Sequence, residues 1–152
     1  MAPHFKQETR TDGLTEVDFD YCFMSMEGNP LATILVAKEK ATKMGMATVV
    51  PMKGGSIEFP ARRVLAFLKE FGLEGADVVL KSDQEHSMKD LLNNIAQRRS
   101  AVSKLEAAAL GDRVLPIGRS IRESSPVGSS QSNGFIEKAI HDVEGQVRTI
   151  KL

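Results

Sequence analysis

The segment SPVGSSQSNGFIEKAIHDVEGQVR, residues 125–148, joins a loop of small polar residues to an amphipathic helix. Apolar residues recur along it at helical spacing, which predicts a stripe that faces a hydrophobic core. The stripe consists of Phe135, Ile136, Ala139, Ile140, Val143 and Val147. The other face carries, at intervals of three or four residues, Glu137, His141, Glu144 and Arg148. Either Ser132 or Asn133 is expected to cap the helix. A solvated polar face is the simplest interpretation of this segment alone, and the edge of an active site is the alternative.

Length and composition indicate one globular domain of 152 residues, with 41% hydrophobic and 26% charged residues. Basic and acidic residues number 20 each, so a nucleic-acid partner would require a local basic patch. Cys22 is the single cysteine, expected as a small core residue, and the three histidines are dispersed, which argues against a zinc site. We find no signal-peptide pattern and no membrane-spanning apolar run. These features predict an intracellular protein, nuclear or cytoplasmic, without membrane association.

The first half of the chain is typical of an antiparallel meander. Residues 1–16 are polar and are expected to form a flexible arm, with the folded domain at 17–152. From residue 17 to residue 24, aromatic and β-branched residues alternate with Asp18, Asp20, Cys22 and Met24, which predicts a strand with two different faces. Further strands are expected at 33–37 and 46–52, and the short connections favour antiparallel pairing.

The second half is expected to add a helix, a strand and another helix. Residues 58–71 form the first helix, which Gly72 ends, and residues 77–81 form a buried strand. The core face of the next helix carries Met88, Leu91, Leu92 and Ile95. Residues 103–110 could continue this helix, 113–117 could form a fifth strand, and 119–124 is expected to be a polar loop. The order predicts an α/β fold, with three antiparallel strands and then parallel strands in one mixed sheet flanked by helices.

Three carboxylates on separate predicted elements are candidates for a metal site. Asp20 lies on the first strand, Asp83 follows the fourth strand, and Glu137 lies in the first turn of the last helix. Ligands gather outside the carboxyl ends of strands in open α/β sheets. Carboxylate oxygens suit Mg²⁺ or Mn²⁺, and two such ions can clamp the attacking and leaving oxygens of a phosphoryl displacement.

Each candidate also has a purely structural interpretation. Asp18 could take the place of Asp20, and Asp83 could be a helix cap or a turn residue. Glu137 could stabilise the positive end of the helix dipole. His141 could carry a proton or contact a phosphate, although a solvated histidine is the simpler expectation.

Three local motifs resemble the integrase catalytic core of retroviruses and LTR retrotransposons. They are DYCF at Asp20, LKSDQE around Asp83, and SSQSNGFIEKAI around Glu137, which contains the pattern Gln-Ser-x-Gly-x-x-Glu. The resemblance implies a ribonuclease-H-like fold and a catalytic Asp, Asp, Glu triad that binds two Mg²⁺ or Mn²⁺ ions. In this sequence the triad would be Asp20, Asp83 and Glu137.

The same resemblance implies a function, which is DNA 3′-processing and strand transfer during retrotransposon integration. The partners would be the DNA ends of the element and the target DNA, and a complete protein would be a homo-oligomer. The residues expected to contact DNA are Gln131, Asn133, Lys138 and His141.

The sequence also departs from the family pattern. The interval between Asp83 and Glu137 is longer than usual, and the family's His/Cys zinc module and C-terminal DNA-binding domain are not found in these residues. We therefore expect a catalytic core that is incomplete at the C-terminus. Two other functions stay open, a ribonuclease-H-type nuclease and a non-catalytic remnant of a retroelement polyprotein that binds nucleic acid or protein.

Overall fold

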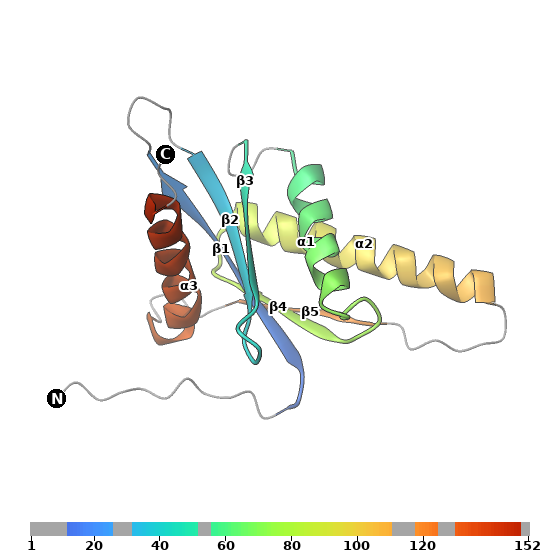
Figure 1. Ribbon diagram of the computed structural model, residues 1–152. Helices are drawn as coiled ribbons and strands as arrows, with labels where there is room; N and C mark the ends of the chain where they lie inside the picture. The colour runs from blue at the N-terminus through green and yellow to red at the C-terminus, as the bar shows by residue number, and fades with distance from the viewer. Residues whose placement is uncertain (1–11, 26–31, 52–55, 111–117, 125–129, 150–152) are drawn as a thin grey trace.

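The computed structural model describes residues 12–25, 32–51, 56–110, 118–124 and 130–149. Its elements are β1 (Thr15–Met24), β2 (Ala32–Glu39), β3 (Gly45–Val50), α1 (Glu58–Glu70), β4 (Val78–Ser82), α2 (His86–Leu110), β5 (Ser120–Ser124) and α3 (Ser130–Thr149). The strands form one sheet in the order β3-β2-β1-β4-β5. Helices α1 and α2 lie on one face of this sheet and α3 lies on the other (Figure 1). The predicted mixed α/β fold is confirmed.

The first three strands form the predicted antiparallel meander, and a rigid turn joins β2 to β3. The carboxylate of Glu39 accepts hydrogen bonds from the N–H groups of Ala41 at 2.9 Å and Thr42 at 2.6 Å. It also accepts one from the Thr42 hydroxyl at 2.5 Å. Burial opposes ionisation of Glu39, but these hydrogen bonds outweigh it and hold the pKa of Glu39 below its ordinary value. The turn is therefore fixed by an ionised, satisfied carboxylate.

The last two strands are parallel to β1, as a crossover connection requires. Our expectation of a polar loop at 119–124 was wrong, because Ser120–Ser124 is strand β5. This strand is polar because it lies at the edge of the sheet and pairs only with β4. Helix α2 continues through residues 103–110, and the strand considered at 113–117 lies outside the described residues.

The alternation along β1 divides its side chains between two cores, as predicted. Val17 and Phe19 belong to a large core beneath α1 and α2. Cys22 lies in a smaller core beneath α3, with Ile136 and Ala139. Burial raises the pKa of the Cys22 thiol to about 11, so this cysteine is an inert core residue. Successive side chains of a strand point to opposite faces of the sheet, so Glu16, Asp18 and Asp20 lie on the same side as Cys22, the side that α3 covers.

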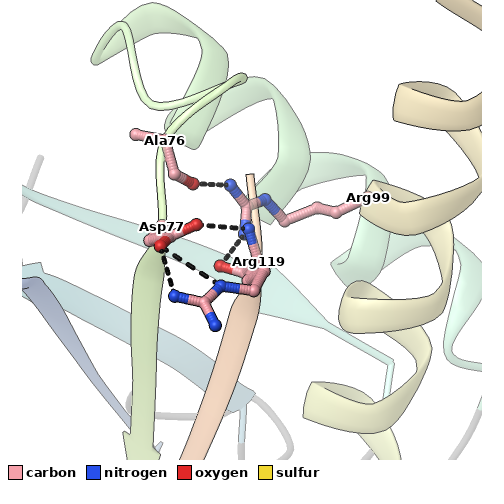
Figure 2. Close-up of polar contacts among 4 residues, drawn as sticks. All are labelled: Ala76, Asp77, Arg99 and Arg119. Carbon is pink, nitrogen blue, oxygen red and sulfur yellow. Dashed lines mark hydrogen bonds and ion pairs between the residues drawn. The ribbon is translucent and has the colours of Figure 1, made fainter. Parts of the chain in front are cut away.

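A buried arginine attaches α2 to the start of both parallel strands (Figure 2). The side chain of Arg99 is 5% exposed. Its guanidinium donates hydrogen bonds to the main-chain oxygens of Leu73 (3.0 Å), Ala76 (2.6 Å) and Arg119 (3.2 Å) and to the Ser120 hydroxyl (2.6 Å). These bonds satisfy a charge that burial would otherwise make very unfavourable, and they fix where β4 and β5 begin.

The start of β5 is also held against β4 by close packing and an exposed ion pair. The Arg119 guanidinium lies 3.0 Å from the Asp77 carboxylate, and the Arg119 N–H donates to the same group at 2.8 Å. A Cβ atom placed on Gly118 would lie 2.5 Å from the carbonyl oxygen of Ala76. Only glycine can therefore occupy position 118, where the backbone before β5 passes close to the backbone before β4.

Candidate active site

Asp20, Asp83 and Glu137 line one pocket of about 150 Å³. The rest of its wall consists of Asp18, Phe19, Lys81, Ser82 and Ile136. We call this the acidic pocket, because four of its side chains are carboxylates and one is an ammonium group. The fold thus brings together the three carboxylates that the sequence predicted, from β1, from the segment after β4 and from α3.

The acidic pocket forms where β4 ends and β1 continues. The last rung of the parallel ladder between these strands pairs Asp18 with Lys81, and Asp20 and Asp83 each follow two residues later. Helix α3 packs on β1 and β2 and supplies Glu137 beside this step in the sheet. The pocket therefore lies at the carboxyl end of a parallel strand, the usual place for ligands in such sheets.

The backbone fixes Asp20 and Asp83 in place. Asp20 Oδ1 accepts a hydrogen bond from the Tyr21 N–H at 2.8 Å. Asp83 Oδ1 accepts one from the Glu85 N–H at 3.2 Å, so Asp83 forms a turn before α2 as well as lining the pocket. The buried Ser82 hydroxyl donates to the Asp83 carbonyl at 2.9 Å and further orders this turn.

Glu137 lies deeper in its helix than expected. Because α3 begins at Ser130, Glu137 is about two turns from the N-terminus rather than in the first turn. Ser132 and Asn133 likewise lie within the first turn of the helix and not at the position before it, where a cap was expected. The field of a helix dipole falls off within the first turn, so the dipole interpretation of Glu137 was wrong. The Glu137 side chain is exposed at the rim of the acidic pocket.

Asp18 is the site residue that sequence reasoning treated only as a substitute for Asp20. It is 2% exposed and lines the acidic pocket together with Asp20. Burial, followed by a hydrogen bond to Glu16 and repulsion from it, raises the pKa of Asp18 to about 8, although Lys81 and Lys40 oppose the shift. Glu16 itself is buried, with the Lys40 ammonium 3.3 Å from its carboxylate. Acidic residues at every second position, Glu16, Asp18 and Asp20, were the feature of the sequence that could have placed Asp18 on the same face as Asp20.

Two of the residues predicted to contact DNA, Lys138 and His141, lie outside the acidic pocket. Lys138 and His141 are exposed on α3, near Glu137, and neither lines the pocket. Gln131 and Asn133 belong to the first turn of α3, and their side chains lie outside the described part of the chain.

Two lysines that lie beside this helix were not expected from the sequence. The ammonium groups of Lys38 and Lys43 lie 5.6 and 4.9 Å from the centroid of the Phe135 ring. Both come from the end of β2 and its turn, where the sequence KEKATK concentrates positive charge. Positive charge therefore lies beside Phe135, the residue of α3 directly before the pocket residues Ile136 and Glu137.

The oxygen donors of the acidic pocket are of the chemical kind that Mg²⁺ binds. In the described part of the chain, no three His, Cys, Asp or Glu side chains are arranged to hold a metal ion together. The carboxylates line a space of about 150 Å³, well above the roughly 10–15 Å³ that one water molecule needs. Mg²⁺ commonly keeps several waters and binds only one or two carboxylates directly, so this donor set suits it.

A second hollow of about 160 Å³ offers no comparable chemistry. Its walls are mainly apolar side chains of α1, with Lys69, Glu74 and Arg99 at the edge. The Arg99 guanidinium already donates to three carbonyl oxygens and a hydroxyl. We therefore place the candidate site in the acidic pocket, where the ionisable groups converge.

No protein-family profile and no curated protein sequence matches this chain. Among the helices that the structure describes, none is long and apolar enough to cross a membrane.

Proposed function

We propose that this chain is an integrase-type polynucleotidyl transferase that carries out metal-dependent DNA 3′-processing and strand transfer for a retroelement. One observation carries the proposal. Asp20, Asp83 and Glu137 come from three separate segments, and all three line the acidic pocket. The sequence motifs around these residues resemble those of integrase cores, and a mixed sheet with parallel strands next to β1 is consistent with a ribonuclease-H-like arrangement.

In the proposed reaction, the carboxylates of the pocket would hold two Mg²⁺ or Mn²⁺ ions. When bound, such ions activate a water or a DNA 3′-hydroxyl and stabilise the leaving oxygen. The chain itself positions the ligands, since Asp20 and Asp83 each have one oxygen anchored by a backbone N–H. The Lys81 ammonium would attract the scissile phosphate within the same pocket.

The lysines beside α3 support a path for the DNA backbone. Lys38 and Lys43 lie over Phe135, and Lys138 follows Phe135 by one helical turn. These three ammonium groups would contact successive phosphates of a strand that leaves the acidic pocket over the β2–β3 turn. The chain has no net charge, so DNA binding would require a local cluster of positive charge. These three lysines form such a cluster.

Cleavage and joining of end-labelled duplex DNA test the proposal. We expect nicked and joined products with Mg²⁺ or Mn²⁺, and none with EDTA. Asp83→Asn and Glu137→Gln should each lower the rate at least about 100-fold, because each removes a metal-binding carboxylate. Glu144→Gln is the matched control on α3, since Glu144 lies outside the pocket and faces Arg148 at 3.8 Å.

The products distinguish the alternatives. Nicking without joining would assign a hydrolytic nuclease to the pocket instead of an integrase. Activity that is unchanged in both Asp83→Asn and Glu137→Gln would contradict the proposal altogether.

A further inference from the structure

We propose that Asp18 is a fourth metal-binding carboxylate of the acidic pocket, and that it holds one divalent cation on the side next to β4. This inference rests on the proposed function, because it places the ion in the same pocket. It adds a ligand that is not part of the DYCF motif and that the Asp, Asp, Glu pattern does not contain.

One carboxylate oxygen of Asp18 lacks a hydrogen-bond partner among the described residues. Asp18 lines the acidic pocket, is 2% exposed, and has a buried Oδ1 atom without a hydrogen-bond partner among the described residues. A buried carboxylate oxygen that accepts no hydrogen bond from the protein is unfavourable. A cation bound at this oxygen would replace the missing interaction.

The spacing of Asp18 and Asp20 along β1 suits a pair of ions. Asp18 and Asp20 are two residues apart on β1, so their side chains share a face about 7 Å apart. Paired catalytic ions lie roughly 3.5–4 Å apart. Two carboxylates at this separation can therefore each hold a different ion of one pair, with Asp18 on the Lys81 side and Asp20 nearer Asp83.

The charge of the acidic pocket also favours a fourth metal-binding carboxylate. The pocket contains four carboxylates, from Asp18, Asp20, Asp83 and Glu137. Their charge, when all are ionised, equals that of two divalent cations. Three carboxylates would leave two such ions with excess positive charge, whereas four neutralise them and leave the Lys81 ammonium available to a phosphate.

The competing explanation is that Asp18 only shares a proton with Glu16 and has no part in metal binding. Titration of the metal-free chain with Mn²⁺ and no DNA separates the two, with free Mn²⁺ followed by electron paramagnetic resonance. We expect two bound ions in the wild-type chain, and in Asp18→Asn either one ion or an affinity at least about tenfold lower. Asp90→Asn is the control, since Asp90 is an exposed residue of α2, and α2 lies on the face of the sheet opposite α3.

Asparagine preserves the size of the side chain and removes a buried charge, so we expect Asp18→Asn to fold, and a thermal melt checks this. Asp18→Ser provides a second neutral variant. Wild-type Mn²⁺ binding by both variants, with weaker binding by Asp20→Asn, would overturn the role of Asp18 and leave the proposed function intact. A wild-type chain that binds no Mn²⁺ would overturn both.

Discussion

At the scale of single residues, the metal-free chain carries an unfavourable feature in Asp18. Its pKa is about 8 in the folded chain, against 3.8 for an ordinary aspartate. The folded state therefore binds more protons than the unfolded state between these two values. The contribution of Asp18 to the free energy of unfolding is therefore fully present below about pH 4, and it is lost as the pH rises through about 8.

Asp18→Asn should therefore stabilise the metal-free protein at high pH. The amide stays neutral and can still donate a hydrogen bond to Glu16. In EDTA at pH 9 we expect its free energy of unfolding to exceed that of the wild type by on the order of 1–3 kcal/mol, and we expect the difference to disappear near pH 4. Urea unfolding at several pH values measures this. A difference that is independent of pH would contradict the burial of an ionisable Asp18.

At the scale of elements, the sequence predicted those segments whose side chains follow a clear period. The alternation along β1 identified both of its faces, and Gly72 marked the end of α1, where its φ angle is 74°. Strand β5 was missed because its sequence SIRES has no apolar alternation. Its pairing depends on contacts with Asp77 and Arg99, which are distant in the sequence. The start of α3 was misplaced because serines favour loops and caps over helix interiors.

Two glycine substitutions test how closely β5 must approach β4. Gly118→Ala should destabilise the fold by about 1–3 kcal/mol, because the added Cβ would lie 2.5 Å from the Ala76 carbonyl oxygen. Gly145→Ala is the matched control within α3, where a Cβ would meet nothing within 4 Å. It should stabilise the protein by about 0.5–1 kcal/mol through helix propensity. Thermal melts that show the same effect for both changes would refute this account of the β4–β5 approach.

The β2–β3 turn permits a test of the DNA path without any catalysis. Lys38→Gln combined with Lys43→Gln should weaken binding to duplex DNA and lower the slope of log affinity against log salt by up to about two, one for each lost phosphate contact. The control combines Arg62→Gln with Lys69→Gln, two exposed residues of α1 on the opposite face of the sheet. Fluorescence anisotropy in Ca²⁺ measures both. Equal losses in the two double variants would mean that binding follows net charge and not this surface.

At the scale of the whole molecule, the acidic pocket is a product of topology. The parallel pairing of β1 with β4, the early end of β4 and the packing of α3 on β1 and β2 bring together segments that are far apart in the sequence. Motifs in the sequence identified Asp20, Asp83 and Glu137 one at a time. They could not identify Asp18 and Lys81 as neighbours in the same pocket, because that depends on the register between two strands.

The central claim is that this pocket binds catalytic divalent cations, and a crystal of the protein soaked in Mn²⁺ tests it most directly. Anomalous difference maps locate Mn²⁺ without assumptions about activity. We predict two peaks about 4 Å apart inside the acidic pocket, in contact with the carboxylates of Asp20, Asp83 and Glu137. A pocket without any peak at saturating Mn²⁺, or peaks confined to other surfaces, would contradict the claim.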